Sequence, residues 1–236
     1  MTDEATRDRL YAAYATTHAG VSGGGSEPAF QRDIAPHLPA DRSSVILDLG
    51  CGQGQLVQHL LDHGYANSRG VDISPEQVEL AHKAGIGSVR LGDYRAGFDG
   101  ATFDAVTATD FFEHLTKAEM LEALDRVHEA LRAGGVLILR VPNSVSPFGG
   151  NFRYGDFTHE TSFTARSLRQ LAAAAHFADV DVFACPPPVH GAKSLLRSAV
   201  WKATSGAMKL ALAAETGAVR GHLVTQNVVA VMRKGA

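Results

Sequence analysis

A glycine-rich turn between a buried strand and a helix is the feature that most constrains this chain. Residues 45–54 read VILDLGCGQG, an apolar run broken only by Asp48 that leads into three alternating glycines. Such a run predicts a buried parallel strand, and the glycines predict a tight turn that a ligand approaches closely. The following helix, predicted over Gln55–Leu61, then points its free N–H groups into the turn.

The spacing of these glycines decides among the nucleotides that such turns bind. A dinucleotide fingerprint needs glycine or alanine where this chain has Gln55, and a phosphate-binding loop needs a Gly-Lys-Ser/Thr ending that is absent. Asp48, inside the strand, would repel a pyrophosphate but suits a ligand that carries positive charge. S-adenosylmethionine, with its sulfonium and ammonium groups, is such a ligand.

Two further acidic residues follow in order. Asp72 ends a second predicted strand 22 residues beyond Gly50, the separation at which an acid usually binds a ribose diol. Asp93 follows a third predicted strand. Between the two acids, Ser74 and Gln77 have the spacing of a capping box, which predicts the start of a helix.

Together these residues resemble the cofactor motifs of the class I S-adenosylmethionine-dependent methyltransferases. The resemblance implies that Asp48 lies near the methionine amino group and that Asp93 lies near the adenine amino group. It assigns cofactor binding to Asp48, Gly50, Gly52, Gly54, Asp72, Ile73, Asp93, Tyr94 and Asp110. The alternative is a flavodoxin-like domain that binds no nucleoside.

The order of the remaining elements predicts the fold class. Strands and helices alternate from Val45 onwards, which indicates an α/β fold with a parallel sheet and ligands at the carboxyl ends of its strands. Further strands are predicted at 103–108, 136–141, 180–183 and 224–232, and further helices at 27–37, 117–132 and 164–175. The resemblance implies a doubly wound, mostly parallel, seven-stranded Rossmann-like sheet whose last strand is antiparallel.

Composition limits the kinds of protein to which this chain can belong. With 236 residues, 45% of them hydrophobic, the chain is expected to form one domain over residues 1–236. A net charge of −3 gives no electrostatic case for a nucleic-acid partner. Two cysteines form no disulfide framework, and neither a signal peptide nor a membrane span is evident, so we expect a cytoplasmic protein.

Two segments outside the sheet allow more than one interpretation. Residues 1–26 are predicted to form an amphipathic helix and a glycine-rich hinge, either as a lid that brings Tyr14 and His18 to the substrate or as simple packing. Residues 191–216 are predicted to form one or two basic amphipathic helices. Such a helix can lie on a membrane surface, but packing on its own domain or a homodimer interface is favoured.

The residues that follow the fourth predicted strand carry the candidate chemistry. Methyl transfer to a sugar hydroxyl needs alignment, exclusion of water and removal of a proton. In one hypothesis, His114 or His159 is a metal-free general base. In a second, Glu113, His114 and His159, with Asp110 as a further candidate, hold Mg²⁺ or Mn²⁺. In a third, these side chains only shape the pocket.

The metal hypothesis also has a family resemblance. The pattern of Glu113, His114 and a distant His159 is similar to the small-RNA terminal 2′-O-methyltransferases, which bind a divalent ion beside a diol. That family has glutamate where this chain has Asp110, so the shorter side chain puts a fourth ligand in doubt.

The second half of the chain resembles bacterial saccharide O-methyltransferases, in particular those of methylmannose polysaccharide biosynthesis. The motifs are the run from Pro142 to Phe163, which includes RYGDFTHE, and the later ETG and TQN. The resemblance implies a saccharide substrate bound by Asn151, Arg153, Tyr154 and Asp156. The alternatives are a methyltransferase for a small aromatic or isoprenoid acceptor, an RNA methyltransferase disfavoured by charge, and a non-catalytic adaptor.

Overall fold

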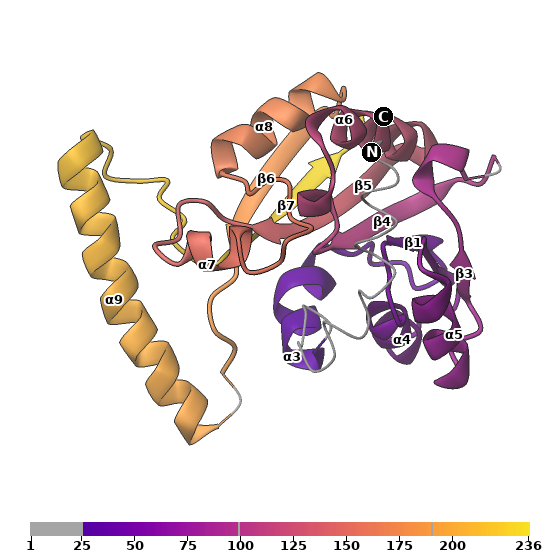
Figure 1. Ribbon diagram of the computed structural model, residues 1–236, viewed down its shortest axis with the longest axis horizontal. Helices are drawn as coiled ribbons and strands as arrows, with labels where there is room; N and C mark the ends of the chain where they lie inside the picture. Colours follow the sequence, from indigo (N-terminus) through magenta and orange to yellow (C-terminus); the bar gives the residue numbers. More distant parts are fainter. Residues whose placement is uncertain (1–25, 99, 190) are drawn as a thin grey trace.

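The computed structural model describes residues 26–236, except 99 and 190. The predicted lid helix, with Tyr14 and His18, therefore lies outside the described residues. Within them, a central sheet has helices on both faces (Figure 1).

The sheet has seven strands in the order β3-β2-β1-β4-β5-β7-β6. Strands β1 to β5 pair in parallel, and β7 runs antiparallel to both β5 and β6. The predicted doubly wound α/β fold with an antiparallel last strand is therefore confirmed. The strands are β1 (Ile46–Leu49), β2 (Ser68–Asp72), β3 (Val89–Leu91), β4 (Phe103–Thr109), β5 (Leu131–Pro142), β6 (Asp179–Ala184) and β7 (Asn227–Arg233).

The helices cover the sheet in two layers. Figure 1 shows α6 and α8 on one side of the sheet and α3, α4 and α5 on the other. The helices are α3 (Glu27–Ala29), continued by η1 (Phe30–Ile34) and η2 (Ala35–His37), then α4 (Gln55–Asp62), α5 (Pro75–Lys83), α6 (Lys117–Ala130), α7 (Gly149–Arg153), α8 (Ala165–Ala174) and α9 (Ala192–Thr216). Single turns are η3 (Tyr94–Ala96) and η4 (Phe112–His114).

Two hydrophobic cores follow from the alternation of side chains along each strand. In β1, Ile46 packs with Phe30 and Leu60 in one core, whereas Leu47 and Leu49 belong to the other core. All of β1, including Asp48, is buried. A carboxylate within such a strand therefore stands in an apolar surrounding.

The start of α5 differs from the predicted capping box. The Ser74 side chain accepts a hydrogen bond from the Gln77 N–H, as predicted. The reciprocal half is replaced, because the Ser74 N–H donates to Asp72 Oδ1 at 2.8 Å. The carboxylate that ends β2 thus takes the place of the Gln77 side chain and ties the helix start to the sheet edge.

The predicted turn before β5 is also revised. The sequence predicts a helix to Arg132 and a strand from Val136, but α6 ends at Ala130 and β5 begins at Leu131. Leu131 pairs with Phe103 across an irregularity in register. Gly134 and Gly135, where the sequence predicts a turn, therefore sit in an irregular part of β5 rather than between two elements.

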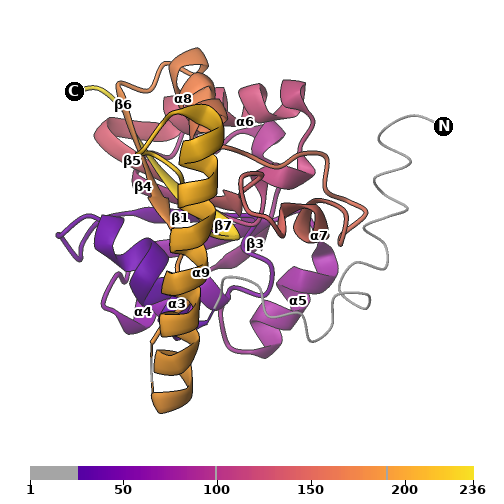
Figure 2. The same ribbon diagram turned by 90° about the vertical axis from the view of Figure 1, so that its left-hand side faces the viewer.

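The segment 191–216 forms one helix, α9, and leaves the body of the molecule (Figures 1 and 2). Of its residues only Ser194 is buried. Packing on its own domain does not cover Leu195, Leu196, Val200 and Leu210, which are exposed, and the homodimer alternative stays a prediction. No helix in the described part of the chain has both the length and the hydropathy needed to cross a membrane.

Candidate functional site

A cavity of about 420 Å³ lies at the carboxyl ends of β1, β2 and β4. This is the edge at which a doubly wound sheet binds its ligands. The predicted cofactor residues in its wall are Gly50, Gly52, Asp72, Ile73, Asp93, Tyr94 and Asp110. Seven residues that are far apart in the sequence thus share one cavity.

The glycine turn is held open by backbone conformation. Gly50 has φ of 71° and Gly52 has φ of 52°, values that favour glycine. A Cβ atom at Gly50 would lie 2.5 Å from Cδ2 of Phe111. Phe111 also lines the cavity, so the first glycine gives room both to this ring and to a ligand.

Asp72 connects the turn to the next helix. Its Oδ2 accepts a hydrogen bond from the Gly52 N–H at 2.8 Å, and its Oδ1 accepts the one from Ser74. Burial raises the pKa of this carboxyl. Each carboxylate oxygen has a second lone pair, so the side chain can still accept hydrogen bonds from a ribose diol.

Two of the predicted cofactor residues lie behind the cavity wall rather than in it. Asp48 is buried below the turn, where its Oδ1 accepts a hydrogen bond from Thr107 Oγ1 at 2.7 Å. Its Oδ2 has no hydrogen-bond partner among the described residues. A Cβ atom at Gly54 would lie 2.8 Å from Val89 Cγ2, so Gly54 serves the packing of α4 on β3.

Desolvation decides the charge state of Asp48. Burial raises the pKa of its carboxyl to about 7, and the hydrogen bond from Thr107 opposes this shift. A buried carboxylate with an unpartnered oxygen favours a cation nearby.

The end of the cavity around Asp93 carries an ion-pair network that the sequence did not reveal. The Asp93 carboxylate accepts from the Arg95 side chain at 2.8 Å, and Arg95 also pairs with Glu119 of α6. Tyr94 is buried between these elements, with the Arg95 guanidinium over its ring. Asp93 therefore lines the cavity with its position fixed by Arg95.

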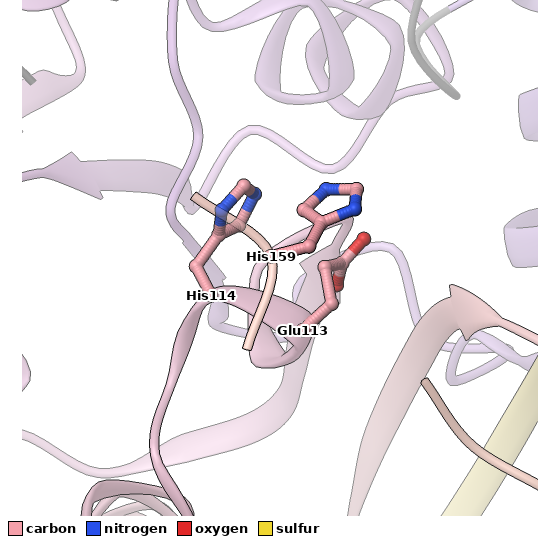
Figure 3. A group of neighbouring side chains, drawn as sticks. All are labelled: Glu113, His114 and His159. Atoms are coloured by element: carbon pink, nitrogen blue, oxygen red, sulfur yellow. The ribbon is translucent and has the colours of Figure 1, made fainter. Parts of the chain in front are cut away.

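The candidate catalytic residues meet at the other end of the cavity. Glu113, His114 and His159 offer ligand atoms that all lie within 4.8 Å of one another (Figure 3). Glu113 and His114 lie on η4 after β4, and His159 comes from the loop that follows α7. His114 also lines the cavity, which joins this cluster to the predicted cofactor residues.

Backbone contacts hold the distant loop against η4. The N–H groups of Glu160 and Thr161 donate to the Glu113 carbonyl oxygen at 2.7 and 3.2 Å. The Arg153 guanidinium donates to the carbonyl oxygens of His159 and Glu160. Arg153 was predicted to bind substrate, but in the structure its donors order the loop.

Hydrogen bonds fix the tautomers of both histidines. The Thr158 hydroxyl donates to Asp156 Oδ1 at 2.6 Å and so accepts from His114 Nδ1 at 2.9 Å. His159 Nδ1 donates to the Phe152 carbonyl oxygen at 2.8 Å. In the neutral form each imidazole therefore carries its lone pair on Nε2.

Burial determines the charge states of His114 and Glu113. It lowers the pKa of His114 to about 4, with a further contribution from His159, so His114 is neutral at pH 7. Burial and then Asp110 raise the pKa of Glu113 well above its ordinary range. Glu113 is 1% exposed, and its Oε2 has no hydrogen-bond partner among the described residues.

These donors fit a divalent cation. One buried carboxylate and two imidazoles are a ligand set for Mn²⁺ or a related ion, and water and substrate oxygens would complete the shell. A cation would also satisfy the unpartnered Glu113 oxygen. The residues present are therefore compatible with the metal that the resemblance implies.

Asp110 lies outside this ligand set. Its φ is 54°, in the left-handed region, and its carboxylate pairs with Arg140 of β5. Arg140 is partly buried and also faces Asp33 Oδ2 at 3.7 Å. The sequence analysis missed Arg140, although a charge within the apolar run of β5 is the same signal that singled out Asp48.

The remaining predicted substrate residues lie on the loop around α7. Tyr154 is 80% exposed, as is the neighbouring aromatic residue Phe157 at 88%, and Asn151 is exposed on α7. Asp156 orders the loop, since it accepts from both the N–H and the hydroxyl of Thr158. None of these side chains lines the described cavity.

Comparison with known proteins supports the same family. The family model described as a methyltransferase domain matches residues 27–182. Trans-aconitate 2-methyltransferase of Rhizobium rhizogenes is 27% identical over 49% of this chain and 45% of its own length. The O-methyltransferase cnsE of Penicillium expansum is 28% identical over 64% of this chain and 58% of its own length. The chain thus spans about half the length of these curated relatives.

Solved structures share the fold across nearly the whole chain. A SAM-dependent methyltransferase from Archaeoglobus fulgidus has a TM-score of 0.68 at 18% identity, covering 94% of this chain and 99% of its own. The 1,6-didemethyltoxoflavin-N1-methyltransferase of Burkholderia thailandensis, with S-adenosylhomocysteine bound, has a TM-score of 0.63 at 20% identity, covering 100% and 92%. With its sheet order, its glycine turn and a family match over residues 27–182, this chain belongs to the methyltransferase-domain family and has the class I fold of S-adenosylmethionine-dependent methyltransferases.

Proposed function

We propose that this protein transfers the methyl group of S-adenosylmethionine to a hydroxyl oxygen of a saccharide. The observation that carries the proposal is the position of His114. This side chain lines the predicted cofactor cavity and also belongs to the cluster with Glu113 and His159. A group able to act on an acceptor proton therefore lies beside the place expected for the methyl donor.

The cofactor half supports a positively charged nucleoside. The cavity has Asp72 and Asp93 in its wall and the buried Asp48 behind it. These acids suit a ribose diol, an adenine amino group and an ammonium group, respectively. Phosphate-binding cations are missing from the glycine turn itself, so a pyrophosphate ligand fits less well.

The reaction is an in-line displacement at the methyl carbon. A bond forms between the acceptor oxygen and the methyl carbon while the carbon–sulfur bond breaks, and S-adenosylhomocysteine leaves with the electron pair. The acceptor hydroxyl loses its proton in this step. The neutral His114, with its lone pair on Nε2, can accept that proton.

A divalent cation offers a second way to activate the hydroxyl. Glu113, His114 and His159 would hold it, and the bound ion would lower the pKa of the acceptor hydroxyl. The buried, unpartnered oxygen of Glu113 favours this version over the metal-free base. Thr158 and the Phe152 carbonyl would then orient the two imidazoles.

A saccharide acceptor is favoured by the loop that supplies His159. Tyr154 and Phe157 present exposed aromatic rings near this end of the molecule, and such rings stack on the faces of sugars. The resemblance of this loop to saccharide O-methyltransferases supports the same class. A small aromatic acceptor would need no polar groups at the methyl position, whereas His114 lines the cavity there and adjoins Glu113 and His159.

The test is transfer from labelled S-adenosylmethionine to a panel of mono- and oligosaccharides. We expect product on at least one sugar, loss with EDTA, and recovery with Mn²⁺ or Mg²⁺. Product formed in the presence of EDTA would still support a saccharide acceptor, and it would assign His114 as a metal-free base. No product on any sugar, despite cofactor binding, would contradict the saccharide acceptor.

A binding measurement separates the metal from the reaction. Glu113→Gln keeps the side-chain volume but removes the carboxylate charge, so it should weaken Mn²⁺ binding measured by calorimetry. Glu129→Gln, on the exposed side of α6, is the matched control and should bind Mn²⁺ like the parent chain. Equal binding by both variants would contradict the proposed metal site.

A further inference from the structure

Helix α9 presents an apolar face that the body of the protein does not cover. Figure 1 shows this helix standing beside the domain, and Figure 2 shows its length in front of it. Leu195, Leu196, Val200 and Leu210 are 61%, 69%, 59% and 74% exposed. Exposed leucines of this kind mark an interaction surface when they share one face of a helix.

These four residues do share one face. At 3.6 residues per turn they fall within an arc of about 140°. Small residues at Ala199, Ala203, Gly206, Ala207 and Ala214 fill the same arc. Trp201, Met208 and Leu212 lie on the opposite side, where they are only partly exposed. The helix therefore has a distinct outer apolar face, defined by Leu195, Leu196, Val200 and Leu210.

Basic residues border this outer apolar face on both sides. Lys193 and Arg197 lie along one border, and Lys202 and Lys209 lie along the other. Glu215 is the one acidic residue of the helix, so α9 carries +3. Because the whole chain carries −3, the residues outside α9 together carry −6. Positive charge is thus concentrated on a helix whose outer apolar face is exposed.

The basic borders of α9 distinguish between two partners for this face, a second copy of the chain and an anionic lipid surface. In a symmetric pair of chains, two outer apolar faces in contact would bring basic borders together with a single acid from each helix. An anionic lipid surface has the opposite charge, takes up apolar side chains, and lets lysine side chains reach the headgroups. Repulsion of the acidic body by the same surface would leave α9 as the contact.

We propose that α9 docks this protein on membranes that contain anionic lipids, with the outer apolar face inserted between the headgroups. The helix lies along the surface and does not cross it, in agreement with the absence of a spanning helix among the described residues. The proposal concerns location and does not depend on the methyl acceptor.

The test is co-sedimentation of the full chain with vesicles of phosphatidylcholine, with and without phosphatidylserine. We expect binding to the vesicles with phosphatidylserine and little binding to phosphatidylcholine alone. Lys202→Gln with Lys209→Gln should weaken binding about tenfold or more. Lys83→Gln with Lys117→Gln changes the net charge equally at exposed sites outside α9 and should bind like the parent chain.

A second pair of variants tests insertion of the apolar face. Leu196→Gln with Leu210→Gln keeps every charge and should reduce vesicle binding, while circular dichroism and thermal unfolding check that the fold is retained. Equal binding to vesicles with and without phosphatidylserine would overturn the proposal. So would the absence of vesicle binding, together with Leu196-dependent dimerisation in sedimentation velocity, which would assign the face to a second copy.

Discussion

The two halves of the cavity are built in different ways. The cofactor half uses backbone: Gly50 and Gly52 adopt left-handed conformations, and Asp72 accepts hydrogen bonds from main-chain N–H groups. The acceptor half uses buried side chains, among which Glu113 keeps an unpartnered oxygen. Both halves keep a buried oxygen without a hydrogen-bond partner among the described residues, Asp48 Oδ2 in the first and Glu113 Oε2 in the second, and a cationic ligand or a metal ion would offset their desolvation.

The difference indicates a division of labour. In our proposal the preformed backbone cradle binds a constant ligand, and the cluster of ionisable groups acts on the variable acceptor. Variants in the acceptor half should therefore change turnover, and variants in the cofactor half should change affinity for S-adenosylmethionine.

The largest effect is expected from His114→Ala. It removes the imidazole that lines the cavity beside Glu113, so kcat should fall by about 10²–10⁴-fold. The dissociation constant of S-adenosylmethionine, measured by calorimetry, should stay nearly unchanged. His222→Ala removes a histidine outside this cluster and should keep the parent turnover. Unchanged turnover in His114→Ala would contradict a catalytic role for this residue.

The next effect is on the cofactor half. Gly50→Ala places a Cβ atom on a residue with φ of 71° and 2.5 Å from Phe111, so cofactor affinity should fall by about tenfold or more. Gly64→Ala is the matched control, because Gly64 has φ of 89° but nothing within 4 Å of the added atom. It carries the same kind of backbone strain away from the cavity. If both variants bind the cofactor normally, the turn is not its cradle.

The sequence was informative where the site is local. The run from Asp48 to Gly54 and the acid at Asp72 follow one another within single strand–turn–helix units, so pattern and spacing predict their positions. Even there, the role of Gly54 differs, because whether a glycine meets a ligand or a neighbouring strand depends on the packing of α4 on β3.

The sequence was less informative where the site depends on distant contacts. It selected His114 and His159, but not Thr158, whose hydroxyl fixes the His114 tautomer from 44 residues away. It also missed Arg140, which pairs with the Asp110 carboxylate. These partners are brought together by the packing of β4, β5 and the loop after α7. The spacing of residues within one segment does not predict such long-range contacts.

We expect pH to have a moderate effect on cofactor affinity through titration of the Asp48 carboxyl. Its pKa of about 7 means that the carboxyl is mostly neutral at pH 6 and mostly charged at pH 8. A cationic cofactor prefers the charged form, so affinity attributable to Asp48 should rise with pH, by up to about tenfold. The measurement is the ratio of dissociation constants for Asp48→Asn and the parent chain at each pH, which cancels titration of the ligand's amine. A ratio that does not change with pH would contradict a charge interaction.

The smallest effect should come from Thr107→Val, which keeps the shape of the side chain and removes one hydroxyl. That hydroxyl donates to Asp48 Oδ1 and lowers the pKa of the buried carboxyl. Without it the pKa of Asp48 should rise further, so the pH profile of cofactor affinity should keep its form but move to higher pH. Since the cavity wall is unchanged, affinity at high pH should approach that of the parent chain. A profile that does not move, or that moves to lower pH, would contradict the effect of the Thr107 hydroxyl on the Asp48 carboxyl that this geometry requires.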